Sequence, residues 1–225
     1  MFYLSKKILD AYKRNRLIIA FIQGTQGLGK TTYALKVAKE VYGSWEKALD
    51  YMFFEPLPSL FLMKAAAEQG ERIPLIIYDD AGKFFSKYLF QTEFQNFAVK
   101  ISILFDVIRI VCNAVILTAP VQDVLKEIRK KCWWVVEIIE KDPYWSIAKI
   151  YKKKINAVGK VWHKQLAQDV FQPKLPDHIY EMYMKRRRQA DLDVIEDAIN
   201  EFLAAEAKRR QRLQESLEKA KLDMA

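Results

Sequence analysis

Apolar runs alternate with amphipathic stretches along the first two thirds of the chain. Uninterrupted apolar runs bounded by turn residues are typical of strands in a parallel sheet that helices cover on both faces. Such runs predict strands at 17–22, 51–54, 75–78, 114–118 and 133–139. Apolar residues at helical spacing predict helices at 4–12, 31–41, 59–69, 92–108 and 122–131. This alternation predicts an α/β fold built on a doubly wound parallel sheet.

The pattern changes after the last of these strands. Alternating apolar and polar positions at 146–151 and 160–166 predict a β-hairpin joined across 152–159. The segment 173–176 reads Pro-Lys-Leu-Pro and predicts a stiff linker, after which Asp177 is placed to cap a long C-terminal helix. We therefore divide the chain into a core at 1–142, a hairpin extension at 143–172 and a charged helix at 173–225.

A glycine-rich segment follows the first predicted strand and precedes a predicted helix. It fits the phosphate-binding (Walker A) pattern G-x-x-x-x-G-K-[ST] in the strand–loop–helix context that the pattern requires. Glycines allow N–H groups to turn toward a phosphate at the positive end of the following helix. Lys30 is expected to reach the outer phosphates of ATP, and Thr31 to ligate Mg2+. The predicted nucleotide-binding residues are Gly24, Thr25, Gln26, Gly27, Leu28, Gly29, Lys30, Thr31 and Thr32.

An acidic pair, Asp79 and Asp80, ends the buried run at 75–78. The carboxyl ends of parallel strands form the edge at which open α/β sheets bind their ligands. Asp79 is expected to hold Mg2+ directly or through water (Walker B), and Asp80 to orient or deprotonate the attacking water. An acidic cap on the next helix is the alternative. Asp79 lies 48 residues after Thr31, which leaves room for one helix–strand–helix layer and favours the functional interpretation.

The segments 24–32, 75–80 and 115–118 together resemble the additional-strand P-loop ATPases, the branch that holds AAA+, RecA-like and FtsK/HerA-like motors. The resemblance covers 17–139 and implies a three-layer P-loop NTPase sandwich that hydrolyses ATP. The stretch 78–88 (Tyr-Asp-Asp-Ala-Gly-Lys-Phe-Phe-Ser-Lys-Tyr), with the hairpin and the basic tail, is similar to ATPases of crenarchaeal viruses and plasmids described as DnaA-like. That similarity implies ATP-dependent work on DNA in replication initiation, packaging or partition.

The same resemblance suggests roles for Thr118 and Arg129. In ATPases of this kind, a polar residue at the end of the strand that matches 114–118 contacts the γ-phosphate or the lytic water, and Thr118 is the candidate for this sensor. A threonine at a strand end is also ordinary on propensity alone. Arg129 begins a cationic helix end where ring ATPases often carry an arginine finger for a neighbouring subunit. The helix macrodipole favours cations there without any function, so both interpretations stay open.

The composition of the chain is consistent with a full hydrophobic core and indicates the kind of partner that the protein binds. Hydrophobic residues make up 51% of the 225 residues, and the formal net charge of +9 favours a polyanionic partner. The two cysteines, Cys112 and Cys132, are too few for a disulfide framework and are expected to be buried thiols. The longest apolar window, 101–119, contains Asp106 and Arg109 and does not qualify as a membrane span. The N-terminus lacks a signal-type apolar segment, so we expect a cytoplasmic protein.

The predicted hairpin carries lysines interleaved with aromatic residues. This composition suits contact with a nucleic-acid backbone, whereas edge strands also use lysine to prevent aggregation, and the two interpretations stay open. For the basic C-terminal helix, docking on its own domain, on a neighbour or on DNA stays open beside a solvated charged helix. The candidate nucleic-acid-binding residues are Lys152, Lys153, Lys154, Lys160 and Lys164.

Together these patterns predict a magnesium-dependent ATPase that acts on DNA. We expect a homo-oligomer without a membrane anchor, with a replication or packaging protein as a further partner. Water attacks the γ-phosphate while Lys30 neutralises charge and Asp80 positions the nucleophile. Two alternatives stay open: a small-molecule kinase, which shares the loop and the size but usually needs a mobile lid with arginines, and a nucleotide-gated binding protein with slow hydrolysis.

Overall fold

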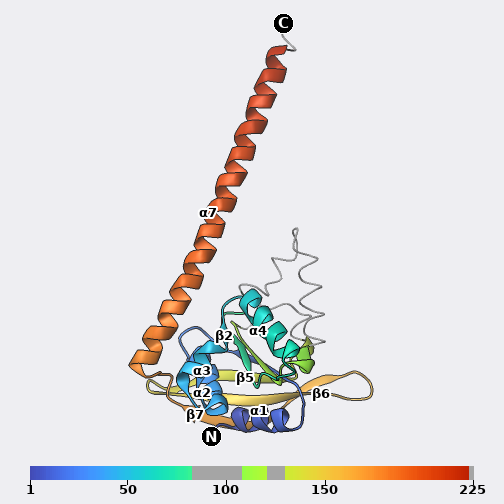
Figure 1. Ribbon diagram of the computed structural model, residues 1–225, viewed down its shortest axis with the longest axis vertical. Coiled ribbons are helices and arrows are strands. Elements are labelled where there is room, and N and C mark those ends of the chain that lie inside the picture. The colour runs from blue at the N-terminus through green and yellow to red at the C-terminus, as the bar shows by residue number, and fades with distance from the viewer. Residues whose placement is uncertain (83–107, 121–129, 223–225) are drawn as a thin grey trace. The chain divides into compact units, whose positions relative to one another are not determined.

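The computed structural model describes residues 1–82, 108–120 and 130–222. The chain divides into two compact units, Met1–Tyr180 and Glu181–Ala225. The first unit contains the strands and the helices α1 to α4 labelled in Figure 1, and the second contains most of helix α7 (Asp177–Leu222). The predicted helices at 92–108 and 122–131 lie outside the described residues, apart from their last positions.

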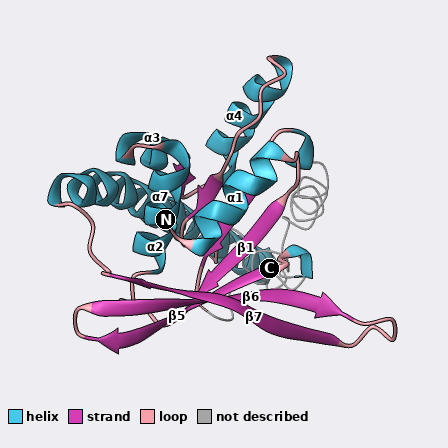
Figure 2. Ribbon diagram, turned by 90° about the horizontal axis from the view of Figure 1, so that it is seen from below, coloured by secondary structure: helices cyan, strands magenta, loops and turns pink. Residues whose placement is uncertain are grey.

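Seven strands of the described residues form one sheet in the order β2-β3-β4-β1-β5-β6-β7. The first five in this order pair in parallel, and β6 and β7 continue the sheet as an antiparallel hairpin (Figure 2). The predicted core strands and the predicted hairpin are therefore confirmed, but the hairpin strands are longer than predicted, and 152–155 belong to β6 instead of the connection. The strands are β1 (Ile18–Gln23), β2 (Met52–Phe53), β3 (Ile76–Tyr78), β4 (Ala114–Thr118), β5 (Trp134–Asp142), β6 (Trp145–Ile155) and β7 (Val161–Phe171).

The strand order determines which strand ends meet. β4 pairs with β1 on one side and with β3 on the other, so an additional strand separates the phosphate-loop strand from the acidic strand. Because these strands are parallel, their carboxyl ends lie at the same edge of the sheet. The phosphate loop, the acidic pair and the end of β4 are thereby brought to one place. The P-loop α/β fold predicted from the sequence is confirmed.

The central strands are buried on both faces, which explains their uninterrupted apolar sequences. Phe21 of β1 and Leu117 of β4 belong to one buried cluster that also contains Cys112 and Cys132. Both cysteines are buried thiols outside any disulfide, as predicted. Burial raises the pKa of the Cys112 thiol to about 12, so this thiol stays protonated near neutral pH.

The helices of the first unit agree with the sequence pattern except at two places. A short helix follows Ser44, whose side-chain oxygen accepts a hydrogen bond of 3.2 Å from the Lys47 N–H and caps the helix. The predicted helix at 59–69 begins earlier, at Pro56, because proline suits the first turn of a helix. The helices are α1 (Tyr3–Lys13), α2 (Lys30–Tyr42), α3 (Trp45–Asp50) and α4 (Pro56–Glu68), and a 3-10 turn covers Ile108–Ile110.

The hairpin and the last helix complete the fold. β6 pairs with β5 as far as Lys152 and with β7 as far as Ile155, so the last residues before the tip form a two-stranded ribbon. The tip is closed by Asn156, whose carboxamide oxygen accepts the Lys160 N–H at 2.7 Å. The long C-terminal helix is confirmed as α7. Among the described residues, no helix has the length and apolar content that a membrane crossing needs.

Candidate functional site

The phosphate loop connects the end of β1 to the start of α2. Gly29 precedes α2 with φ +87°, a left-handed conformation that favours glycine. Gly24 has φ +151°, and a Cβ built on it would lie 2.7 Å from the Ile138 carbonyl oxygen of β5. These two positions therefore need glycine for both conformation and space. Thr25, Gln26 and Gly27 are exposed, whereas the rest of the predicted loop is half-buried or buried.

Lys30 is the first residue of α2, and its side chain turns back into the loop. The ammonium donates hydrogen bonds to the carbonyl oxygens of Gly24 at 3.0 Å and Thr25 at 2.9 Å. Only 8% of the residue is exposed. A cation is thus held beside the backbone N–H groups at the positive end of α2, and this arrangement suits a phosphate group.

Asp79 connects residues from the start of α2 and the end of β4. Its Oδ1 accepts one hydrogen bond of 2.7 Å from Thr31 Oγ1 and another of 2.6 Å from Thr118 Oγ1. Asp79 and Thr118 are each 1% exposed. The structure therefore brings together three of the residues selected from sequence, each from a different element.

These oxygens fit a magnesium ion. Mg2+ is held in proteins by one or two carboxylates, a hydroxyl and phosphate oxygens, with water at its remaining positions. The Thr31 hydroxyl and the Asp79 carboxylate supply such oxygens at the start of α2. In the part of the chain that is described, no cluster of three or more His, Cys, Asp and Glu side chains could hold a metal by itself. A magnesium ion at this site would therefore take its remaining ligands from phosphate oxygens and water.

Asp80 follows Asp79 in an unusual conformation. Its φ is +49°, a left-handed value that aspartate tolerates better than longer side chains. Its backbone N–H donates to Thr118 Oγ1 at 3.1 Å, and the next N–H, from Ala81, donates to the Thr118 carbonyl oxygen at 2.8 Å. Thr118 thus fixes the turn that carries Asp80. The left-handed turn also gives a physical reason for aspartate at this position.

The hairpin lysines divide between the two faces of the ribbon. Residues directly opposite one another in an antiparallel pair share a face, and successive residues alternate. Lys152 pairs with Lys164, and Lys154 pairs with Trp162, so these four residues lie on one face. Lys153 lies on the other face, with its ammonium 5.5 Å from the Trp133 ring.

Lys160, which was predicted, and Trp145 stand apart from this ribbon face. Lys160 lies in the tip just before β7. Trp145 begins β6, about 30 Å along the strand from Lys154, and does not join the basic face. Arg129, the candidate arginine finger, lies outside the described residues.

Two contacts near the phosphate loop were not predicted from the sequence. Ser146 of β6 donates a hydrogen bond of 3.1 Å to the Leu28 carbonyl oxygen. Asp169 of β7 accepts a hydrogen bond of 2.7 Å from the Tyr33 hydroxyl of α2. Neither contact has a local signal, since 118 and 136 residues separate the partners. The hairpin is therefore attached to the phosphate loop and to the helix that follows it.

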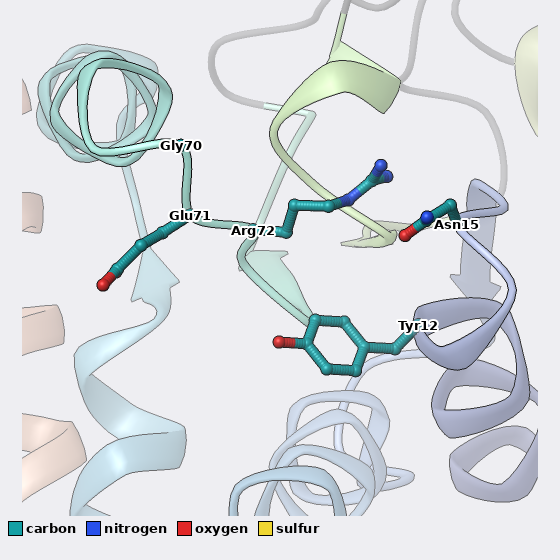
Figure 3. A pocket seen from close by; sticks show the side chains of 5 residues that line it. All are labelled: Tyr12, Asn15, Gly70, Glu71 and Arg72. Atoms are coloured by element: carbon teal, nitrogen blue, oxygen red, sulfur yellow. The ribbon is translucent and has the colours of Figure 1, made fainter.

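A pocket of about 620 Å³ lies away from the phosphate loop. Tyr12, Asn15, Gly70, Glu71 and Arg72 line it, as Figure 3 shows. Arg72 precedes β3, whereas the phosphate loop follows β1, so the pocket and the loop lie at opposite ends of parallel strands. Arg72 is used within the fold, where it donates to Asn113 Oδ1 at 3.1 Å. The pocket is thus separate from the phosphate loop.

No protein-family model matches the chain. Two viral proteins are similar to it over most of its length. Uncharacterized protein B-251 of Sulfolobus spindle-shape virus 1 is 37% identical over 223 residues, which cover 92% of this chain and 87% of that protein. Uncharacterized protein ORF286 of Acidianus two-tailed virus is 30% identical over 211 residues, which cover 82% of this chain and 74% of that protein. The chain belongs to this family of viral proteins.

Some solved structures are also similar to this member of the viral family. The N-terminal domain of zonular occludens toxin from Neisseria meningitidis gives a TM-score of 0.42 at 13% identity, over 74% of this chain and 98% of that chain. The genome packaging NTPase B204 from Sulfolobus turreted icosahedral virus 2, in complex with ATP-gammaS, gives a TM-score of 0.38 at 12% identity. This similarity covers 68% of this chain and 99% of that chain. Both scores and both identities are too low to indicate a shared function.

Proposed function

We propose that this protein hydrolyses ATP with magnesium and uses the hydrolysis for work on DNA. One observation carries the proposal: Thr31 of the phosphate loop and Thr118 of β4 donate hydrogen bonds to the same oxygen of Asp79. Hydroxyl and carboxylate oxygens thereby meet at the start of α2, the helix whose first residue, Lys30, donates its ammonium to the loop carbonyl of Gly24. A phosphate chain with a divalent cation matches this combination of charges.

Each residue has a defined task in this proposal. Thr31 and Asp79 are the residues that would hold Mg2+, which offsets negative charge on the phosphate oxygens. Lys30 neutralises charge that develops on the transferred phosphoryl group. Asp80 orients the attacking water or accepts its proton. Thr118 donates to Asp79 and accepts the Asp80 N–H, which supports a role in positioning the acidic pair beside the sensor role expected from the resemblance.

DNA is the proposed partner of the hairpin. Lys152, Lys154 and Lys164 share one ribbon face with Trp162, which is 45% exposed. Lysines at this spacing suit successive phosphates, and an exposed indole suits stacking on a base. The net charge of +9 adds a long-range attraction to a polyanion. Lys153 and Lys160 extend the basic surface to the other face and to the tip.

Assembly and biological process form the finer part of the proposal. We infer a homo-oligomer in which Arg129 reaches the nucleotide of a neighbouring subunit, as in ring ATPases. Membership of a family of viral proteins supports replication initiation, genome packaging or partition as the DNA process, with a replication or packaging protein as a further partner. We include in this proposal a relationship to the DnaA-like ATPases that the sequence resembles.

Steady-state phosphate release from ATP tests the proposed function. The purified protein is assayed with Mg2+ alone, with single-stranded DNA and with duplex DNA of equal length, beside Lys30→Ala. Lys39→Ala, a lysine substitution later in the same helix, is the matched control. We expect DNA to raise the rate several-fold, Lys30→Ala to abolish release, and Lys39→Ala to behave as the wild type.

Two results would contradict the proposal in different ways. Phosphate transfer only when a small acceptor molecule is supplied would identify a kinase. ATP-dependent DNA binding with hardly any turnover would identify a nucleotide-gated binding protein. In both cases the phosphate loop keeps its assigned ligand, and the DNA-stimulated ATPase is wrong.

A further inference from the structure

The base of the β6–β7 hairpin contacts the phosphate loop at two adjacent residues. Ser146 Oγ donates to the Leu28 carbonyl oxygen at 3.1 Å. A Cβ built on Gly29 would lie 2.7 Å from Pro173 Cβ and 3.3 Å from the Phe171 ring, so the loop backbone passes directly against the end of the hairpin. Ser146 and Phe171 pair across the ribbon, and both contacts therefore come from its base.

The hydrogen bond from Ser146 fixes the direction of a backbone donor. The Leu28 C=O and the Gly29 N–H belong to one trans peptide, in which the two groups point in opposite directions. Anchoring the carbonyl on β6 therefore aims the Gly29 N–H away from β6. Gly29 directly precedes α2, where backbone N–H groups bind phosphate. Ser146 is 2% exposed, so packing holds its hydroxyl in place.

The other hairpin strand holds the first turn of α2. Asp169 accepts from the Tyr33 hydroxyl at 2.7 Å and from the Tyr3 N–H at 3.1 Å. The Tyr33 N–H in turn donates to the Gly29 carbonyl oxygen at 2.8 Å, and the Tyr33 ring lies 5.2 Å from the Phe171 ring. Both strands of the hairpin thus contact the loop or the helix turn that follows it.

We propose that Ser146 is a positioning residue for nucleotide binding, and that the hairpin couples DNA bound near its tip to the phosphate loop. The proposal rests on the proposed function for its two ligands. Paired residues run from Ser146 to Ile155, about 30 Å, so the ribbon is a continuous connection between the tip and the loop. Coupling of this kind is reciprocal: ATP changes the affinity for DNA by the factor by which DNA changes the affinity for ATP.

The positioning role is tested with three serine variants. Ser146→Ala removes the hydroxyl and Ser146→Thr keeps one. Ser5→Ala is the matched control, because Ser5 is also buried and its hydroxyl donates to a backbone carbonyl, that of Val37, at 3.5 Å. The readouts are the dissociation constant for ATP with Mg2+, the KM and kcat of ATP hydrolysis, and the melting temperature.

We expect Ser146→Ala to raise the dissociation constant and the KM for ATP by roughly threefold to tenfold with little change in kcat, as for the loss of one hydrogen bond. Ser146→Thr restores most of the affinity, and Ser5→Ala has wild-type affinity. Wild-type ATP affinity in Ser146→Ala overturns the positioning role. The positioning role is also overturned if Ser146→Thr does not restore the ATP affinity and the affinity falls with the melting temperature in all variants. That result would indicate that Ser146 has a structural role alone.

The coupling is tested by ATP titrations with and without a DNA duplex. In the wild type we expect DNA to change the ATP dissociation constant, and in Ser146→Ala we expect most of that change to disappear while DNA still binds. No change in the wild type, or an equal change in both proteins, overturns the coupling. If the wild type binds ATP and Ser146→Ala has the same ATP dissociation constant, this inference alone is contradicted. If the wild type binds no ATP, the proposed function itself is contradicted.

Discussion

Thr31 Oγ1 donates a hydrogen bond of 2.7 Å to Asp79 Oδ1, across 48 residues of sequence. The contact joins the residue after the phosphate-loop lysine to the residue at the end of the acidic strand. β3 and β1 are not neighbours in the sheet, since β4 lies between them. The contact therefore depends on the pairing of β3, β4 and β1, and the candidate nucleotide site is assembled by the fold rather than by any one segment.

The hydrogen bond between Thr31 and Asp79 is expected to stabilise the fold measurably. Thr31→Val should lower the free energy of unfolding by about 1 kcal/mol, because a buried acceptor loses one donor. In an Asp79→Ala background the same substitution should cost less, since its partner is already gone. Urea denaturation of the wild type, both single variants and the double variant measures this coupling. Strictly additive effects would show that the two residues do not interact in solution.

Substitutions of Asp80 are expected to change the rate of catalysis and the stability of the fold independently. Asp80→Asn keeps the size and the tolerance of the left-handed conformation, so stability should change by less than about 0.5 kcal/mol while kcat falls roughly 100-fold or more. Asp80→Glu keeps the charge but should lose about 1 kcal/mol of stability at φ +49°. Denaturation and steady-state kinetics are measured on both variants. Full activity in Asp80→Asn would remove Asp80 from the mechanism.

The hairpin face predicts a specific salt dependence of DNA binding. Replacing Lys152, Lys154 and Lys164 with alanine should reduce the slope of log affinity against log salt by about three, because each phosphate contact releases roughly one counterion. Lys64→Ala on α4 is the matched control, since that lysine side chain is 74% exposed outside the hairpin. Fluorescence anisotropy at several salt concentrations measures the slope. An equal slope in the triple variant and the wild type would show that DNA binds elsewhere.

Stability is expected to fall on the alkaline side. Burial raises the pKa of Cys112 from 9.0 to about 12 and that of Tyr78 from 10.0 to about 12. A raised native pKa means that the native state binds the proton more tightly. Its contribution to stability is complete below the unfolded pKa and is lost as the pH rises toward the folded pKa.

The Cys112 thiol provides the cleanest variant for this effect. Between pH 8 and pH 10.5, the wild type should lose about 2 kcal/mol more unfolding free energy than Cys112→Ala, which lacks the titrating group. Denaturant titrations at the two pH values measure both proteins. Identical losses in wild type and variant would show that burial does not hold the thiol in its protonated form.

The sequence predicts those parts of the fold whose signals are local. The glycine-rich loop, the apolar strands and the acidic pair each carry their pattern within a few residues. The sharing of Asp79 by Thr31 and Thr118 follows once the parallel order is known, because strand ends then meet at one edge. The motifs therefore selected residues that the fold brings into contact, and the roles of these residues in nucleotide binding stay a prediction.

Other features had no local signal. The contact between Ser146 and Leu28 depends on how an antiparallel extension lies against the loop, which no spacing rule encodes. The left-handed turn at Asp80 depends on hydrogen bonds from its backbone region to Thr118. Helix α3 did have a signal, the capping Ser44, but its short length left no periodicity to detect.

The central claim is that the phosphate loop binds ATP through Lys30, and calorimetric titration of ATP with Mg2+ tests it most directly. The wild type, Lys30→Ala and the Lys39→Ala control are compared. We predict that the wild type and Lys39→Ala bind one ATP per chain with similar affinity. Lys30→Ala should bind at least roughly tenfold more weakly, as for the loss of a charged hydrogen-bond donor. Equal ATP affinity in Lys30→Ala and the wild type, or no ATP binding by the wild type, would contradict this account.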